Sequence, residues 1–168
     1  MTFDVRPVRA EEWQALRDLR LRALTEDVTA FGDTLEKAHA RTDDEWRRYA
    51  HDGPASVTFV ATIGGRFVGM SRGRVLDGGD AGLFGMWVAP EARRRGAGRR
   101  LVVAVVDWAR ERGVARVLLD VAEERPPARA LYASCGFVET GRRAPCESHE
   151  EVMEREMAFV FREAGREP

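Results

Sequence analysis

The amino-acid sequence predicts a mixed α/β fold, in which one domain spanning residues 1–168 holds a central sheet of about seven strands with helices on both faces. The length of 168 residues suits a single domain. Runs of alternating apolar and polar residues, separated by glycine-rich turns, recur through the middle of the chain. Amphipathic helical stretches precede these runs and separate the later ones. Hydrophobic residues make up 44% of the chain, which is enough for a core that needs no disulfide or metal.

The first third of the chain predicts one strand and two helices. Residues 2–8 alternate as an opening strand, and residues 11–25 repeat apolar side chains at helical spacing. Residues 27–41 show a mixed pattern that Phe31-Gly32 breaks. A short helix follows, with Thr42 as its N-cap and Glu45 as the capping-box partner.

The middle of the chain predicts three strands joined by tight turns. Residues 57–63 alternate as a strand, Gly64-Gly65 forms a hairpin turn, and residues 67–75 return. After a turn at residues 77–80, residues 82–88 form the next strand.

The last third predicts helices interleaved with strands. Residues 98–112 carry one broad apolar stripe and form a helix. Residues 115–121 are nearly all apolar, as expected for a buried strand. Pro127 suits the first turn of a helix that ends at Ser134. One strand then starts at residue 137, and residues 153–161 form the last.

Composition excludes several classes of function. The formal net charge of −1 gives no general attraction to nucleic acid or to acidic membranes. Cys135 and Cys146 form no metal-binding spacing, so we expect no metal. The chain shows neither a targeting segment nor a membrane-spanning run. We therefore expect a cytoplasmic protein.

The loop between the strand at 82–88 and the helix at 98–112 carries the most informative residues: Arg93, Arg94, Arg95, Gly96, Ala97, Gly98, Arg99 and Arg100. The first turn of a helix leaves main-chain N–H groups without partners, and these groups favour phosphate. Glycines let an anion approach the main chain, and arginines add charged hydrogen bonds. The loop thus predicts a diphosphate site.

Three other interpretations of this loop were weighed. A P-loop needs Gly-Lys-Ser/Thr, but Arg99-Arg100 follows the glycines. A dinucleotide fingerprint needs a third glycine where Leu101 stands. A general polyanion patch is the remaining alternative, and the position between strand and helix favours the diphosphate site over it.

Two motifs make the sequence similar to the GNAT superfamily of N-acetyltransferases. The phosphate-loop signature of this family, Arg/Gln-x-x-Gly-x-Gly/Ala, is matched by Arg93, Gly96 and Gly98. Its second motif, Asn-x-x-Ala-x-x-Leu-Tyr-x-x-x-Gly-Phe, is matched by Ala128, Leu131, Tyr132, Gly136 and Phe137. The resemblance covers nearly the whole chain.

The resemblance implies a sheet whose two central parallel strands splay apart, with acetyl-CoA as the co-substrate. The pantetheine arm is expected in the opening, bonded to the main chain of Met86, Trp87 and Val88. Gly85, just before them, fits a β-bulge. The phosphates are expected on the loop from Arg93 to Arg100.

The second motif implies further site residues. Tyr132 is the expected general acid for the departing CoA sulfur and also a cofactor contact. Its alternative role is to pack and orient the sulfur. Arg125 replaces the motif asparagine. It is counted with the cofactor-binding residues, where it reaches a phosphate or else points into solvent.

The general base is left open by the sequence. Asp80 and Glu123 lie near the ends of the central strands, where an amine could arrive. Residues 149–151, before the last strand, are further candidates, and a chain of water molecules would also serve.

The acceptor is expected to be a primary amine of a small molecule, peptide or protein, attacking directly in a ternary complex. The resemblance implies that residues 24–41 and 142–152 shape its groove. Acidic residues there would favour a cationic acceptor. Family members are often dimers, which leaves a homodimer open. Two alternatives remain: a non-catalytic acyl-CoA-binding regulatory module, and a nucleic-acid binder, which the net charge disfavours.

Overall fold

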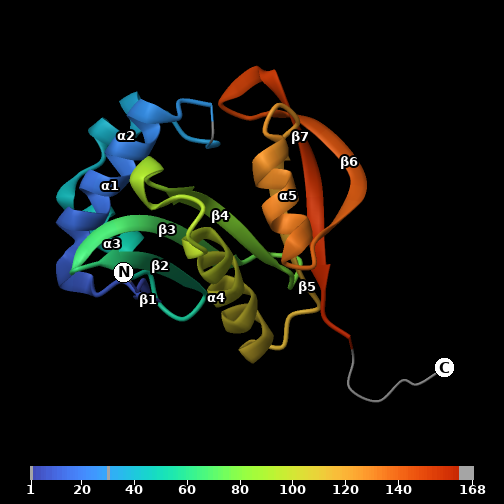
Figure 1. Cartoon of the computed structure of the whole chain (residues 1–168), viewed down its shortest axis with the longest axis horizontal. Coiled ribbons are helices and arrows are strands. Elements are labelled where there is room, and N and C mark those ends of the chain that lie inside the picture. The colour runs from blue at the N-terminus through green and yellow to red at the C-terminus, as the bar shows by residue number, and fades with distance from the viewer. Residues whose placement is uncertain (1, 30, 163–168) are drawn as a thin grey trace.

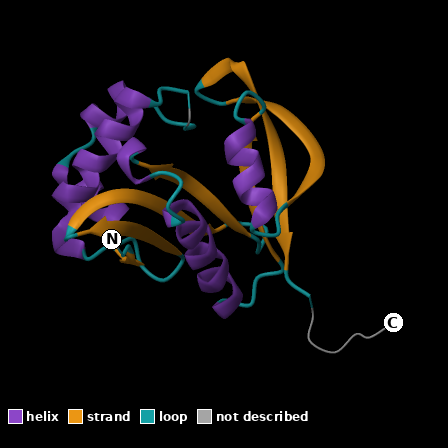
Figure 2. Cartoon of the chain, in the orientation of Figure 1, coloured by secondary structure: helices purple, strands orange, loops and turns teal. Residues whose placement is uncertain are grey.

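The computed structural model describes residues 2–29 and 31–162. Residues 1, 30 and 163–168 of the expected domain lie outside this part. Seven strands form one sheet, and helices pack against it (Figure 1 and Figure 2). The mixed α/β fold expected from the sequence is confirmed.

The elements follow one another in this order: β1 (Asp4–Pro7), η1 (Ala10–Glu12), α1 (Trp13–Glu26), α2 (Leu35–Ala40), α3 (Asp43–Ala50), β2 (Ser56–Ile63), β3 (Arg66–Val75), β4 (Ala81–Val88), η2 (Pro90–Ala92), α4 (Ala97–Glu111), β5 (Arg116–Ala122), α5 (Pro126–Ser134), β6 (Val138–Cys146) and β7 (His149–Val160). No helix within the described ranges is long and apolar enough to cross a membrane.

The sheet consists of two antiparallel halves that meet at one parallel junction. The strand order is β1-β2-β3-β4-β5-β7-β6, and only β4 and β5 are parallel. These two strands pair at Ala81–Val117 and Gly82–Leu118 alone. Figure 1 shows the halves spreading apart beyond this junction. We call the unpaired region between residues 83–88 of β4 and 119–122 of β5 the wedge.

A β-bulge interrupts β4 within the wedge. Arg72 of β3 pairs with Phe84 and Met70 pairs with Trp87, so β4 advances three residues while β3 advances two. Gly85 has a φ of 58°, a left-handed conformation that glycine adopts at little cost. The bulge expected at this glycine is confirmed.

The two faces of the first half of the sheet carry different helices. Gly73 of β3 faces α4, because a Cβ built on it would lie 2.9 Å from the ring of Trp108. The adjacent Arg72 points to the other face, where its guanidinium carbon lies 4.5 Å from the ring centroid of Tyr49 in α3. Alternation along the strand therefore separates an α4 face from an α1–α3 face.

Two segments differ from the sequence-based expectation. Residues 27–41 contain the helix α2, whose N-cap Thr34 accepts a hydrogen bond from the Lys37 N–H at 3.2 Å. The expected groove segment 142–152 is mostly strand, because β6 continues to Cys146 and β7 already begins at His149. Both strands are largely exposed there, so the apolar alternation that marks a half-buried strand is missing.

Candidate functional site

The start of α4 presents a row of main-chain donors. The first hydrogen bond of the helix runs from the Arg100 N–H to the Gly96 carbonyl at 3.2 Å. Among the described residues, none of the N–H groups of residues 94–99 has a hydrogen-bond partner. Consecutive unpaired N–H groups at the positive end of a helix form a site for a phosphate-sized anion.

Backbone conformation shapes this row. Arg94 and Gly96 have φ values of 60° and 87°, both left-handed. A Cβ on Gly96 would meet nothing within 4 Å, so its conformation, not crowding, explains the glycine. A Cβ on Gly98 would lie 3.1 Å from side-chain atoms of both Leu131 and Met86. Gly98 therefore lets α4 approach β4 and α5 closely.

The arginines of the loop divide into two groups. The side chains of Arg94 and Arg95 are exposed and make no ion pair or hydrogen bond with any described residue. Arg99 donates to the Ser134 carbonyl at 3.0 Å, close to the same loop. Arg100 instead donates to the carbonyl of Phe3. This bond tethers the loop to the N-terminal segment, and a cofactor contact of Arg100 stays a prediction.

Asp27, at the end of α1, accepts hydrogen bonds from side chains in three parts of the site. It accepts hydrogen bonds from the Trp87 indole at 2.5 Å, from Arg93 at 2.9 Å and from Arg125 at 3.2 Å. Burial alone would raise the pKa of Asp27, but the bonds from Trp87 and Arg125 hold it below its ordinary value. The carboxylate is therefore charged at neutral pH.

Both arginines of this cluster make contacts that the sequence did not predict. Arg93 also donates to the Val88 carbonyl at 2.9 Å. Its side chain therefore stabilises the end of β4. Arg125 donates to Asp27 and to the Thr29 hydroxyl at 3.3 Å. Its side chain is partly exposed and bonds to the end of α1, a contact that the sequence did not predict.

Met86, Trp87 and Val88 are the last three residues of β4. They belong to the part of β4 whose edge toward β5 has no strand partner. Their other edge is paired at Val88–Gly69 and Trp87–Met70. The exposed edge offers main-chain donors and acceptors to an extended ligand.

Tyr132, in α5, is buried with only 7% of its surface exposed. Its ring packs edge-on against Phe137, with the centroids 6.0 Å apart. Burial raises the pKa of Tyr132 far above its ordinary value, and the nearby Cys135 adds to the effect. The hydroxyl is therefore protonated at neutral pH, as a proton donor must be.

The two candidate bases lie in unsuitable surroundings. Asp80 directly precedes the paired residue Ala81, at the closed end of the wedge, and accepts a hydrogen bond from Arg116 at 3.0 Å. Glu123 lies at the open end, but hydrogen bonds from Arg143 and then Arg155 lower its pKa to about 2. A carboxylate held so strongly in its charged form is a poor proton acceptor at neutral pH.

Asp120 is a carboxylate that the sequence analysis missed. Val117, Leu119 and Val121 are buried with α4 and α5, so Asp120 on the alternate positions of β5 faces the opposite side of the sheet. Asp120 is exposed at the surface, and its pKa is raised by partial desolvation and then by the neighbouring Glu156. The signal was a single acid within residues 117–122 of β5, which are otherwise apolar.

The two segments expected to shape the acceptor groove meet in the structure. The Ser148 hydroxyl, in the β6–β7 turn, donates to the Gly32 carbonyl at 2.9 Å. Of the acidic residues in this region, Glu150 and Glu151 are exposed. Glu154 is half-buried beside Asp120, and its pKa is raised by burial and by that neighbour.

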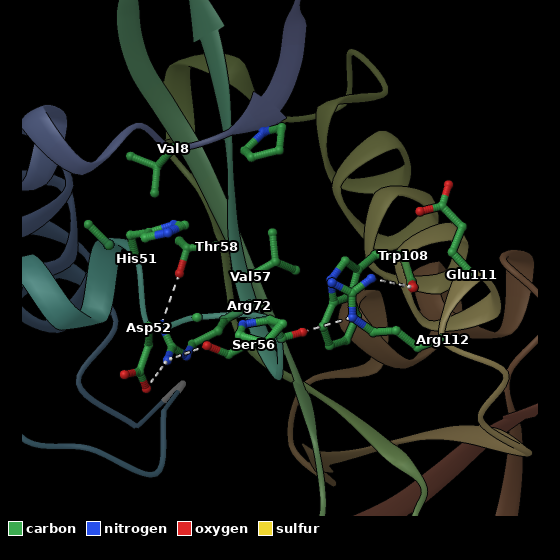
Figure 3. A pocket seen from close by; sticks show the side chains of 14 residues that line it. Val8, His51, Asp52, Ser56, Val57, Thr58, Arg72, Trp108, Glu111 and Arg112 are labelled. Atoms are coloured by element: carbon green, nitrogen blue, oxygen red, sulfur yellow. Dashed lines mark hydrogen bonds and ion pairs between the residues drawn. The ribbon is translucent and has the colours of Figure 1, made fainter.

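A cavity of about 500 Å³ lies elsewhere, between the start of β2 and the ends of α3 and α4 (Figure 3). Its polar lining includes Asp52, Arg72 and Arg112. None of the phosphate-loop residues lines it. The wedge and the start of α4, not this cavity, form the candidate active site.

Comparison with known proteins agrees with this geometry. Residues 13–137 match the family model described as "Acetyltransferase (GNAT) family". The chain is 34% identical over 116 residues to the ribosomal protein bS18-alanine N-acetyltransferase of Escherichia coli K12, covering 68% of this chain and 77% of that protein. It is 36% identical over 118 residues to a probable glucosamine 6-phosphate N-acetyltransferase of Oryza sativa, covering 68% of each.

A solved structure shows the same fold with a ligand. The acetyltransferase yncA of Salmonella typhimurium, determined with its cofactor acetyl-CoA, superposes with a TM-score of 0.80 at 16% identity. The superposition covers 100% of this chain and 99% of that one. The splayed sheet, the row of free N–H groups and the sequence matches lead to one conclusion: this chain belongs to the GNAT family and is an acetyl-CoA-dependent N-acetyltransferase.

Proposed function

We propose that this enzyme moves the acetyl group of acetyl-CoA to the primary amine of a small molecule or of a peptide or protein, by direct attack in a ternary complex. The observation that carries the proposal is the row of unpartnered N–H groups at residues 94–99, beside the open edge of β4. Such a row suits the diphosphate, and the strand edge suits the amide-bearing pantetheine arm.

Side chains complete the cofactor site. Arg94 and Arg95 are exposed and uncommitted, so their guanidinium groups can pair with phosphate oxygens. Arg99 donates to the Ser134 carbonyl at the end of α5. It therefore links the row of N–H groups to that helix. Arg93 and Arg125 act indirectly, because their bonds to Asp27 fix the walls of the site.

Two groups serve the proton transfers. The amine nitrogen attacks the thioester carbon, a C–N bond forms and the C–S bond breaks. Asp120 takes the proton that the amine loses, since its raised pKa makes it a better base than an ordinary aspartate. Tyr132 is protonated at neutral pH, and because burial makes its hydroxyl a weak acid, it gives its proton to the departing sulfur as negative charge develops there.

Calorimetry with acetyl-CoA and a thiol-release assay over a panel of amines test the proposal. We expect saturable binding of acetyl-CoA and turnover of at least one amine. Replacing both Arg94 and Arg95 with Gln should weaken binding about tenfold. Arg110→Gln, at the far end of α4, is the matched control. Absence of acetyl-CoA binding would refute the proposed function, and binding without any turnover would favour the regulatory module.

A further inference from the structure

Arg20, in α1, is a buried cation with unused donors. Only 6% of its surface is exposed. Its Nη2 donates to Asp33 at 3.3 Å, and its guanidinium carbon lies 4.3 Å from the ring centroid of Phe31. Within the part of the chain that the structure describes, Nε and Nη1 have no hydrogen-bond partner. Unpaired donors on a buried charge are costly, so their presence points to a ligand.

These donors lie at the β4 bulge. A Cβ built on Gly85 would be 2.9 Å from Nη1 of Arg20 and 3.4 Å from the Tyr49 hydroxyl oxygen. Because residue 85 is glycine, no side chain stands between Nη1 and the main chain of β4. The bulge lies within the wedge, three residues past the last paired residue, Gly82. A cofactor arm that followed β4 inward from the phosphate loop would reach this point, and the acceptor would meet it there.

The surroundings of Arg20 carry an excess of positive charge. The ring of Tyr49 has three guanidinium groups within 6 Å of its centroid, those of Arg20, Arg41 and Arg72. The carboxylates paired with these three arginines are Asp33, which Arg20 and Arg41 share, and Asp52. Three cations face two anions, so this side of the bulge favours one more negative charge.

Arg72, in the same region, is an arginine whose donors are used within the protein. It donates to the Tyr49 carbonyl at 2.5 Å, to Thr58 at 3.1 Å and to Ser56 at 3.3 Å. Figure 3 shows its guanidinium group among Ser56, Thr58 and Asp52. Its donors are used in holding α3 on the sheet. Arg20 differs, because two of its three nitrogens are left for another group.

The opposite sign prevails on the other side of the wedge. Asp120 and Glu154 lie on the same face of β5 and β7, where Asp120 pairs with Glu156 and Ala122 pairs with Glu154. An amine near these acids and an anionic group near Arg20 would each meet the opposite charge. A molecule carrying both groups matches the site better than a simple amine or a polyamine does.

We propose that the acceptor is a small primary amine that also carries an anionic group, a carboxylate or a phosphate, and that Arg20 is the specificity-determining residue that binds this group. The inference rests on the proposed N-acetyltransferase function and names the class of its acceptor. The carboxylate would come from an amino acid, and the phosphate from an amino sugar phosphate.

Matched pairs of acceptors test the proposal on the unaltered enzyme. Thiol release is measured with acetyl-CoA and L-alanine against its α-amide, and with glucosamine 6-phosphate against glucosamine. We expect kcat/KM for the anionic member of at least one pair to exceed that of its neutral partner by tenfold or more. The pair that responds distinguishes carboxylate from phosphate.

Variants of Arg20 assign the preference to this residue. Arg20→Gln should lower kcat/KM for the anionic acceptor by roughly ten- to hundredfold, and for its neutral partner by less than about threefold. Arg20→Lys keeps the charge and should recover part of the loss. Arg17→Gln, on the same helix but paired with Asp18, is the control. If Arg20→Gln fails to fold, the preference of the unaltered enzyme and Arg20→Lys still decide.

The outcomes separate the two proposals. Acetyl-CoA binding with faster turnover of neutral amines, of an alanine-initial peptide or of a polyamine would overturn the anionic acceptor and leave the N-acetyltransferase function standing. Turnover of none of the anionic amines, or an equal loss for both members of a pair in Arg20→Gln, would overturn it too. Failure to bind acetyl-CoA would instead count against the proposed function itself.

Discussion

Asp27 and Arg125 form an ion pair of 3.2 Å that joins the end of α1 to the residue preceding α5. The first residue belongs to the half of the molecule built on β1–β4, and the second to the half built on β5–β7. Because Asp27 also accepts the Trp87 indole hydrogen, the pair links the two walls of the wedge.

Replacing Asp27 with Ala should destabilise the enzyme. The change leaves the buried Trp87 indole without an acceptor and the guanidinium groups of Arg93 and Arg125 without their carboxylate partner. We expect the free energy of unfolding in urea to fall by about 2–3 kcal/mol. Asp18→Ala, which breaks an exposed pair with Arg17, should change it by less than about 0.5 kcal/mol. Equal losses in both variants would contradict the central role of Asp27.

Substitutions of Gly96 and Gly98, the two glycines of the phosphate loop, should impair the enzyme for different reasons. Gly98→Val inserts atoms between Met86 and Leu131, so it should cost about 1–3 kcal/mol of stability. Gly96→Val strains a left-handed residue in open space, so it should weaken acetyl-CoA binding more than it lowers stability. Urea unfolding and calorimetry on both variants check this contrast. Identical profiles would show that the geometry of the loop has been misjudged.

Asp120→Asn should remove the acidic limb of the pH–rate profile. The raised pKa means that Asp120 is protonated at a higher pH than an ordinary aspartate, and only its deprotonated form can accept a proton. In the unaltered enzyme kcat/KM should therefore fall on acidification through that raised pKa. The variant should lose about 10²-fold in kcat at neutral pH. A retained acidic limb in Asp120→Asn would assign the base elsewhere.

Tyr132→Phe should lower kcat by roughly 10²- to 10³-fold while leaving acetyl-CoA affinity within about threefold. The ring still fills its place against Phe137, so the fold is kept and only the proton donor is lost. Stopped-flow measurement of thiol release under single-turnover conditions isolates the chemical step. An unchanged rate would restrict Tyr132 to packing.

Acid should weaken the N-terminal region through Glu12. Hydrogen bonds from Arg6 lower the pKa of Glu12 from 4.5 to about 2. A carboxyl group with a depressed folded-state pKa stabilises the protein above the unfolded pKa and loses that effect as the pH falls through the folded one. Glu12→Gln should therefore cost about 1 kcal/mol at pH 7 and almost nothing near pH 2. The same cost at both pH values would mean that ionisation is irrelevant.

Local patterns were sufficient for most of the fold. The Thr42–Glu45 capping box is present, with bonds of 2.7 and 3.2 Å, because its signal lies within one turn. The bulge at Gly85 followed from a glycine in the expected place. α2 and the early start of β7 were missed, since neither carries the apolar repeat on which such predictions depend.

The active site was predictable only where its chemistry is contiguous. Residues 94–99 are adjacent in sequence, so strand, turn and helix together revealed them. The contacts of Arg125 with Asp27, 98 positions away, could not be read from either neighbourhood. Asp120 gained its significance from the strand pairing that brings Glu156 beside it. Distances of this kind depend on topology, which a single motif does not encode.

Within the described part of the chain, the two halves of the sheet pair directly at two residue pairs, Ala81–Val117 and Gly82–Leu118. Beyond these pairs, the main-chain N–H and C=O groups on the facing edges of β4 and β5 do not bond to each other. A pantetheine arm in that gap would hydrogen-bond to the strand edges as an added strand does. Binding of acetyl-CoA should therefore raise the melting temperature of the enzyme and slow its proteolysis. The co-substrate of this enzyme would thus also stabilise its fold.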